Sequence, residues 1–404
     1  MISLEDYYDL VGDKVISTIH KKARKILGHH VLHINSTYQG GGVAEILSSL
    51  VPLMNDIGID AGWRILHGNP DFFTITKKFH NALQGDKINL SDKKKSLYLK
   101  TNQDFSVYTH LNHNCIIIHD PQPLPLIKYF TKREPWIWRC HIDISNPNPR
   151  LWAFLKKMII KYDHMIISNE NYRKPNCVVD QTVIYPVIDP LSLKNKELPE
   201  KSINKFLRKF NIPMDKPIIS QISRFDKWKD PLGVLEIFKQ VKKSVDCRLI
   251  LCGSMASDDP EGIKIYDKVK KKAKKYIENG EVILITLDND ILVNVLQRIS
   301  KVIIQKSLKE GFGLTVTEAM WKKTPVIASK SGGIPLQIDH EVNGLLIDPS
   351  DMNGFAQGII KLLKDQKYAE RLGQNAREKV SDNFLITRLL EDYMDLITKV
   401  LYGI

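Results

Sequence analysis

The stretch that decides the fold is Glu310-Gly311-Phe312-Gly313-Leu314-Thr315-Val316-Thr317-Glu318. It follows an apolar, β-branched run, Val302-Ile303-Ile304, and it leads into Ala319-Met320-Trp321. This order of apolar run, glycine-rich turn and second apolar run predicts a buried strand, a loop and a helix that begins near Leu314. The stretch begins and ends with a glutamate. The pattern therefore places one carboxylate, Glu310, in the loop and the other, Glu318, about one turn into the helix.

The chemistry of this corner suits a phosphorylated sugar that carries a second diol. Free backbone amides at a helix N-terminus favour an anionic group. Each carboxylate can accept hydrogen bonds from two neighbouring hydroxyls, worth about 1.5–3 kcal/mol each. Two glutamates at this spacing can also have no ligand. The first would then only interact favourably with the helix dipole, a contribution of about 0.3–1 kcal/mol, and the second would be a solvated surface residue. A second glycine turn, Ser331-Gly332-Gly333-Ile334-Pro335, follows the predicted strand 325–328 and favours the ligand-binding interpretation.

The composition indicates a globular protein of about two domains. The chain has 404 residues, of which 43% are hydrophobic and 26% are charged. No apolar run approaches the roughly 18 residues that a membrane span needs, and the first six residues carry acids where a signal peptide would carry a basic head. The five cysteines include no C-x-x-C pair, so we interpret them as reduced thiols. These features predict a cytoplasmic protein that does not enter a membrane.

The net charge of +13 comes mostly from lysine, with a dense run between Lys264 and Lys275. On a helix such a run is usually a solvated face, and no nucleic-acid-binding motif accompanies it. The sequence therefore predicts no nucleic-acid partner. A basic chain still attracts a diphosphate substrate.

A βαβ unit with a glycine-rich first turn opens the fold. The predicted strand 30–34 runs into Gly40, Gly41 and Gly42, after which 43–57 is predicted as a helix and 61–66 as the next strand. The turn is not G-x-G-x-x-G, so the pattern does not support a dinucleotide site. Three glycines permit close backbone approach to a ligand, with a helix N-terminus available to an anion; the alternative is a flexible surface loop.

Two polar clusters follow later strands of the first half. The apolar run 115–118 leads to Asp120, and the run 136–140 leads to His141 and Asp143. Ligands of a parallel α/β sheet bind at the carboxyl ends of its strands, where both clusters fall. Taken alone, His141 could equally be a structural histidine; its neighbours favour a ligand contact.

The second half begins after a linker and repeats the alternation of strand and helix. The segment 185–200 has three prolines and little periodicity, which indicates an interdomain boundary. The strand 217–222 then ends in a loop that carries Arg224 and Lys229. A guanidinium and a nearby ammonium match a diphosphate and could offset the charge on a departing nucleotide. The alternative is a pair of surface cations.

These features together resemble the family 4 retaining glycosyltransferases of the GT-B fold, whose E-x7-E element binds the donor sugar and the ribose of a nucleotide sugar. Within that family the likeness narrows to the trehalose glycosyltransferring synthases. They join glucose from a nucleoside diphosphate glucose to free glucose, giving α,α-trehalose, and run reversibly. The runs that carry this resemblance are 33–37, 40–45, 119–123, 138–143 and 310–321.

The resemblance implies an α/β GT-B architecture, with two Rossmann-like doubly wound domains facing across a cleft. Residues 1–185 would form the acceptor-side domain, with the helix 384–404 packing back on it, and 186–383 the nucleotide-sugar domain. The implied catalytic residues are His141, Arg224, Lys229 and Glu310. The implied donor-binding residues are Gly40, Gly41, Gly42, Gly311, Phe312, Gly313, Leu314 and Glu318, and the acceptor candidates are Asp120 and Asp143.

Nothing in the sequence identifies a carboxylate nucleophile, which retention often requires. We therefore expect a front-face route in which the leaving phosphate takes the acceptor proton. Asp288-Asn289-Asp290 matches a metal-binding D-x-D but is interpreted as a solvated turn, so we expect no resident metal and no tightly bound cofactor. Mg²⁺ can accompany the nucleotide. The sequence leaves open whether the protein forms a homodimer.

Four other functions also stay open. They are a trehalose phosphorylase, a family 4 transferase with a sucrose-like or phosphorylated disaccharide product, a nucleotide-sugar epimerase, and a basic nucleic-acid or sugar-sensing protein. The synthase reaction requires a nucleotide, whereas the phosphorylase reaction does not. The epimerase would need no acceptor sugar.

Overall fold

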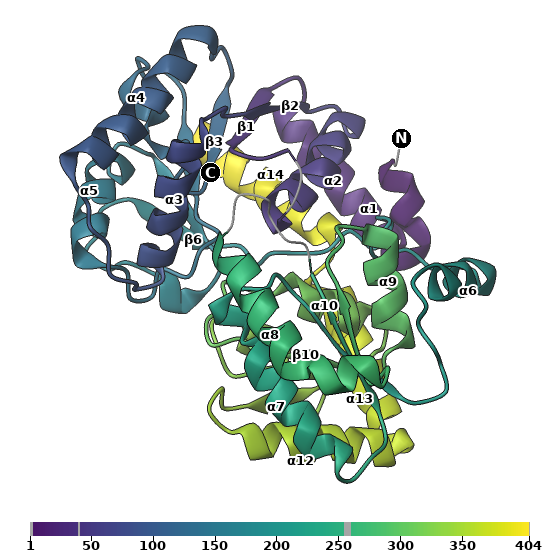
Figure 1. Cartoon of the computed structure of the whole chain (residues 1–404). Coiled ribbons are helices and arrows are strands. Elements are labelled where there is room, and N and C mark those ends of the chain that lie inside the picture. Colours follow the sequence, from purple (N-terminus) through teal and green to yellow (C-terminus); the bar gives the residue numbers. More distant parts are fainter. Residues whose placement is uncertain (1–2, 39–40, 254–259, 404) are drawn as a thin grey trace. The chain divides into compact units, whose positions relative to one another are not determined.

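The computed structural model describes residues 3–38, 41–253 and 260–403 (Figure 1). Contacts divide the chain into two compact units. Unit 1 is Met1–Val187 with Ile386–Ile404, and unit 2 is Ile188–Leu385. The sequence placed these divisions two residues earlier, at 185/186 and 383/384.

Unit 1 is built on a six-stranded sheet in the order β2-β1-β3-β4-β5-β6, and every pairing is parallel. The strands are β1 (His30–Asn35), β2 (Asp60–Ile65), β3 (Cys115–His119), β4 (Trp136–Arg139), β5 (His164–Ile167) and β6 (Asp180–Val183). All residues of β3, β4 and β5 are buried, as expected for central strands of a parallel sheet that is covered on both faces.

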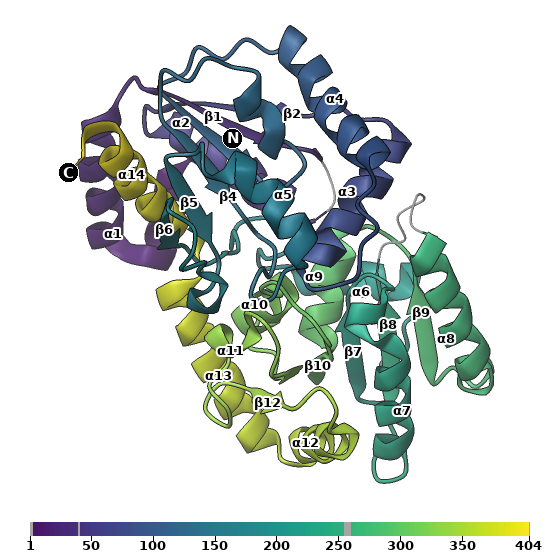
Figure 2. The ribbon, with the colours of Figure 1, turned by 90° about the vertical axis from the view of Figure 1, so that its left-hand side faces the viewer.

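Helices cover both faces of the unit 1 sheet (Figure 2). One side carries α3 (Pro70–Leu83), α4 (Asp92–Tyr108) and α5 (Pro149–Ile159), whose apolar residues share one core cluster with the strands. The other side carries α1 (Tyr8–Ala23), α2 (Gly42–Asp56) and the C-terminal α14 (Ile386–Tyr402). Lys22 of α1 fixes α14 by pairing with Glu391 and Asp395, each at 2.8 Å.

Unit 2 repeats the architecture with the order β12-β11-β10-β7-β8-β9, again wholly parallel. Its strands are β7 (Ile218–Ile222), β8 (Arg248–Cys252), β9 (Val282–Ile285), β10 (Val302–Gln305), β11 (Val326–Ser329) and β12 (Leu345–Ile347). Its helices are α6 (Glu200–Lys209), α7 (Pro231–Lys242), α8 (Pro260–Glu278), α9 (Asp290–Ile299), α10 (Leu314–Trp321), α11 (Ile334–Gln337), α12 (Met352–Lys364) and α13 (Gln366–Asn383). The predicted class, α/β with two doubly wound parallel sheets, is confirmed.

Each sheet has one point at which the direction of winding reverses. In unit 1 the chain turns from β1 outward to β2 and later resumes on the other side of β1 with β3. In unit 2 the reversal lies between β7 and β10, which pair through Ile303 and Ser220. Ligands of doubly wound folds bind beyond the carboxyl ends of the strands at such switch points.

The lysine-rich run forms part of α8, where Val269 and Ala273 face the core and the lysines of the run are exposed. Within the described residues, no helix combines the length and the apolarity that a membrane crossing requires. All five cysteines are buried and unpaired.

Candidate active site

The predicted residues fall into two groups, one at the switch point of each unit. In unit 2, Arg224 and Lys229 follow β7, and Glu310 follows the neighbouring strand β10. Because these strands are parallel neighbours, their carboxyl ends meet at one edge, and the sequence-distant loops converge there.

Glu310 is the best-defined group of this edge. Its Oε2 accepts a charged hydrogen bond from Lys229 Nζ and two further bonds, from Gln305 Nε2 and Ser307 Oγ, each at 3.0 Å. Burial alone would raise the pKa of this carboxyl, but the Lys229 charge and these hydrogen bonds lower it below the ordinary value. Glu310 is therefore an ionised carboxylate that is held in place beside the glycine loop before α10.

The loop after β7 is ordered by its own carboxylates. Asp226 Oδ1 accepts from the backbone N–H groups of Trp228 and Lys229, at 2.9 and 3.1 Å. Asp230 takes the left-handed conformation (φ 41°), caps α7 through Gly233 N, and pairs with the buried Lys306. These bonds fix the backbone on both sides of the Lys229 side chain.

Arg224 differs from Lys229 in its surroundings. Its side chain is 51% exposed, and its Nη2 lies 3.4 Å from Asp226 Oδ2. A half-exposed guanidinium adds little to folding. The Arg224 guanidinium therefore remains available to an anionic ligand at the edge of the sheet that also carries Lys229.

The glycine loop brings the start of α10 close to a second turn. Gly313 has φ 88° and immediately precedes α10, which begins at Leu314 as predicted. Phe312 is buried, with its ring 5.6 Å from that of Phe384. A Cβ at Gly333 would lie 2.7 Å from the Gly311 carbonyl oxygen, so only glycine permits this approach.

Glu318 lies deeper in α10 and is 3% exposed. Its Oε2 accepts from Gln297 Nε2 at 2.8 Å, and Lys194 Nζ lies 3.8 Å from its Oε1. The same lysine lies 3.7 Å from Asp290 of the D-x-D motif, and Asn289 of that motif caps α9 through Leu292 N. Among the described residues, no cluster of three His, Cys, Asp or Glu side chains could hold a metal ion.

In unit 1 the glycine turn and the polar loops reach the corresponding edge. Gly40 lies outside the described residues. Gly41, with φ 93°, precedes α2, and Gly42 is its first residue. His141 donates its backbone N–H to Asp120 Oδ1 at 2.8 Å, and Asp143 Oδ1 accepts from Ser145 N at 2.8 Å.

A chain of three histidines runs behind this edge. His33 Nδ1 lies 3.0 Å from His119 Nε2, and His119 Nδ1 lies 3.0 Å from His141 Nε2. The sequence predicted His141 as a site residue, but neither His119, which belongs to the first polar cluster, nor His33. Position 33 lies in β1 and position 119 ends β3, so the parallel pairing of these two strands, which periodicity does not give, brings them together.

Asp120 is a partly buried residue with a left-handed backbone. Its φ is 63°, in the left-handed region that asparagine also tolerates. Burial raises the pKa of its carboxyl to about 6, although the His141 N–H and the Arg139 charge oppose this shift.

We expect Asp120→Asn to remove a pH-dependent loss of stability. Between the ordinary pKa of 3.8 and the folded value of about 6, the native carboxyl holds its proton more tightly than the unfolded one. The wild-type free energy of unfolding should therefore fall as pH rises through this window. Above pH 6 the variant should be more stable by about 1–3 kcal/mol, and near pH 4 the two proteins should be equal.

Urea unfolding of both proteins between pH 4 and 8 measures this difference. The neutral histidines are present in both proteins and cancel in the comparison. A difference that does not change with pH would contradict the assignment of the shift to Asp120.

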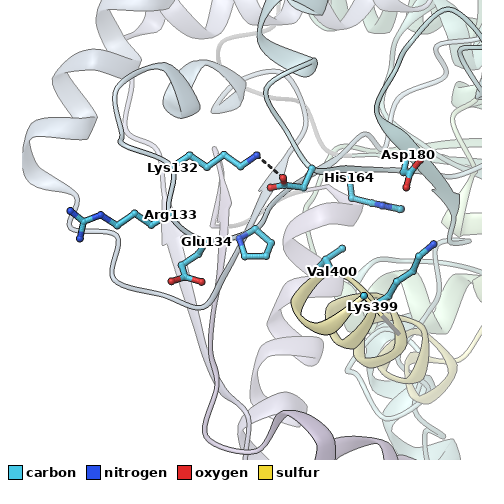
Figure 3. A pocket seen from close by; sticks show the side chains of 10 residues that line it. Lys132, Arg133, Glu134, His164, Asp180, Lys399 and Val400 are labelled. Carbon is cyan, nitrogen blue, oxygen red and sulfur yellow. Dashed lines mark hydrogen bonds and ion pairs between the residues drawn. The ribbon is translucent and has the colours of Figure 1, made fainter.

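A pocket of about 500 Å³ lies at the opposite edge of the unit 1 sheet, where β4, β5 and β6 begin (Figure 3). Its charged lining residues are Lys132, Arg133, Glu134, Asp163, Asp180 and Lys399. Three carboxylates offset three cations, and Lys132 pairs with Asp163 at 2.6 Å. Because it lies at the amino ends of the strands, this pocket is not the candidate active site.

A second pocket, of about 830 Å³, lies beyond the carboxyl end of β2, on the same edge as the histidine chain. Arg64, His67, Phe105 and Tyr108 are among its lining residues. No sequence motif marked it, because its walls come from the loop after β2 and the far end of α4.

The chain matches two family models. Residues 33–174 match the N-terminal domain of trehalose synthase, and residues 202–379 match the glycosyl transferases group 1 domain. The chain is 44% identical over 398 residues to a trehalose synthase of Thermococcus litoralis, covering 98% of this chain and 96% of that protein. It is 27% identical to a trehalose phosphorylase of Pleurotus pulmonarius, covering 94% of this chain and 58% of that protein.

Solved structures show the same fold at low identity. An α,α-trehalose 6-phosphate synthase from Burkholderia multivorans superposes with a TM-score of 0.74 at 13% identity, covering 93% of this chain and 99% of that one. A sucrose-phosphate synthase from Thermosynechococcus elongatus gives 0.72 at 19%, with coverages of 93% and 99%. The near full-length match to trehalose synthases agrees with the two parallel sheets and the residues at their switch points. The chain therefore belongs to the trehalose synthase family of GT-B glycosyltransferases and is an enzyme of that type.

Proposed function

We propose that this enzyme transfers glucose from a nucleoside diphosphate glucose to free glucose, with retention, and forms α,α-trehalose reversibly. The observation that carries the proposal is the buried, ionised Glu310, held by Lys229 next to the N-terminus of α10. This arrangement offers a charged acceptor for sugar hydroxyls, a cation for phosphate and the amide end of a helix without a side-chain cap, all at a single edge.

Each group has a proposed role in donor binding. Glu310 accepts from hydroxyls of the donor glucose, and Glu318 serves the ribose. Arg224 and Lys229 bind the diphosphate. His141 donates to the sugar near its 6-hydroxyl, and Gly41 and Gly42 lie against the donor phosphates.

The proposed chemistry needs no protein nucleophile. The bond between the anomeric carbon and the diphosphate oxygen breaks as the acceptor hydroxyl attacks from the same face, and the acceptor proton passes to the leaving phosphate oxygen. The protein contributes orientation and stabilises the negative charge that grows on the phosphate. Asp120 and Asp143 are the proposed acceptor-side residues. Mg²⁺ can accompany the diphosphate. The proposed compartment is the cytoplasm, a reducing setting that the five unpaired thiols support.

The reverse reaction separates this proposal from its nearest rival, a trehalose phosphorylase. Purified enzyme is incubated with trehalose and either a nucleoside diphosphate or inorganic phosphate. We expect a nucleoside diphosphate glucose in the first mixture and no glucose 1-phosphate in the second. Glucose 1-phosphate formed from trehalose and phosphate, with no reaction of the nucleotide, would establish the phosphorylase and remove the role of Glu318.

We expect Arg224→Ala to lower kcat by about 10- to 100-fold, because it removes one positive group from the developing phosphate charge. The melting temperature should stay within about 1 °C of wild type, since the guanidinium is half exposed. Initial rates at saturating donor measure the effect, and Arg208→Ala, an exposed arginine of α6, is the matched control. Equal turnover of Arg224→Ala and wild type would count against the proposed route.

A further inference from the structure

The histidine chain of unit 1 links the proposed donor contact to the protein interior. His33 of β1 and His119 of β3 are fully enclosed, with 0% and 2% of their surfaces exposed. Neighbouring rings in the chain have centroids 5.3 Å apart in both pairs, and the His119 and His141 rings are stacked. The nitrogen separations of 3.0 Å make both links hydrogen bonds.

All three imidazoles are neutral. Burial lowers the pKa of His33 to about 3 and lowers those of His119 and His141 well below the ordinary value, and the nearby Arg139 guanidinium acts in the same direction on the latter two. A neutral imidazole has one N–H and one lone pair. Each link therefore shares one proton, and fixing the tautomer of one ring fixes the tautomers of the other two.

The inner end of the chain selects between the two arrangements. His33 Nε2 is buried, and among the described residues it has no hydrogen-bond partner. Orphaned buried N–H donors are rare in proteins, so we place the His33 proton on Nδ1, where it donates to His119 Nε2. His119 then donates from Nδ1 to His141 Nε2, and His141 carries its own proton on Nδ1.

We infer that His33 and His119 are positioning residues that hold His141 in its Nδ1–H tautomer, so that it presents a donor to a sugar hydroxyl oxygen. The Asp120 side chain also holds the His141 backbone, by accepting from its N–H. The catalytic part of this inference rests on the proposed contact between His141 and the donor glucose. The tautomeric part concerns the resting protein alone.

Nitrogen-15 NMR of histidine-labelled protein, without substrate at pH 7.5, tests the tautomeric part directly. In wild type we expect His119 and His141 each to show one protonated nitrogen, Nδ1, with no exchange between forms. In His119→Phe the ring space stays filled but the link is lost, so His141 should populate both tautomers. A wild-type His141 that is protonated on Nε2 or is mixed would overturn the inference, and so would an Nδ1–H tautomer that survives in His119→Phe.

A matched pair at position 33 tests the effect on the reaction. Asn and Leu have similar size, but only Asn can donate to His119 Nε2 as the histidine does. We expect His33→Asn to keep kcat within about threefold of wild type and His33→Leu to lower it at least tenfold, with the acceptor KM unchanged in both. Equal kcat for the two variants would contradict a positioning role. If wild type has the expected tautomers but transfers no glucose, the proposed function fails and the hydrogen-bonded chain stands.

Discussion

Glu310→Gln is expected to lower kcat for glucosyl transfer by about 10²- to 10³-fold, a loss of about 2.7–4 kcal/mol in transition-state stabilisation. A neutral amide accepts hydrogen bonds from sugar hydroxyls more weakly than a carboxylate. It also leaves the Lys229 charge without its counter-ion, so the ammonium that we propose to bind the phosphate should change its position. The donor KM should change less than kcat, because the interaction strengthens as positive charge develops at the anomeric carbon.

Steady-state rates at saturating donor and acceptor measure this loss. Glutamine has the shape of glutamate, so circular dichroism should show an unchanged fold. Glu236→Gln is the matched control, because Glu236 pairs with Lys239 on the surface of α7 at 2.9 Å, away from the edge that carries Glu310. Retention of more than a third of wild-type turnover in Glu310→Gln would be incompatible with its proposed role.

Lys229→Ala is expected to impair both turnover and stability. Turnover should fall by about 10³-fold, because the ammonium holds Glu310 and is proposed to bind the diphosphate as well. The side chains of Lys229 and Glu310 are only 16% and 10% exposed. Removing one partner leaves a buried carboxylate uncompensated, and the free energy of unfolding should fall by about 3–5 kcal/mol.

A double-mutant cycle separates the two effects. Urea unfolding of Lys229→Ala, Glu310→Gln and the double variant should show that the second substitution restores about 1–3 kcal/mol of the stability lost in Lys229→Ala, because the double variant has no buried charge at this point. Activity should not return with stability. Additive losses of stability would mean that the two side chains do not form a coupled pair.

The sequence predicted the elements that carry strong local signals. The apolar run 302–304 lies in β10, and the glycine loop gives way to α10 at Leu314. The short strands β6 and β12 went unpredicted. The sequence of β6, Asp-Gln-Thr-Val, has almost no apolar pattern, and β12 has only three residues, too few to show a strand period. The segment 72–104 is polar and rich in lysine, and its sequence gives only hints of the helices α3 and α4. The signal is weakest in α4, where few residues are buried.

Part of the candidate site could be named from the sequence, but its pairings could not. Glu310 and Lys229 stood out as chemistry-bearing residues, yet their ion pair depends on β7 and β10 being neighbours, although 81 residues separate them. Lys306 follows an apolar strand and would be expected at the surface, but it is 2% exposed and pairs with Asp230. Such contacts depend on strand order and register, which a single sequence does not encode locally.

The most direct test of the central claim is a ¹³C NMR time course with unlabelled UDP-glucose or ADP-glucose and glucose labelled at C1 as the acceptor. We predict that one new labelled signal appears, from a non-reducing α,α-linked disaccharide, at the rate at which nucleoside diphosphate is released, and only when both substrates are present. Release of nucleoside diphosphate without a labelled disaccharide, or a labelled product that keeps a reducing end, would contradict the account.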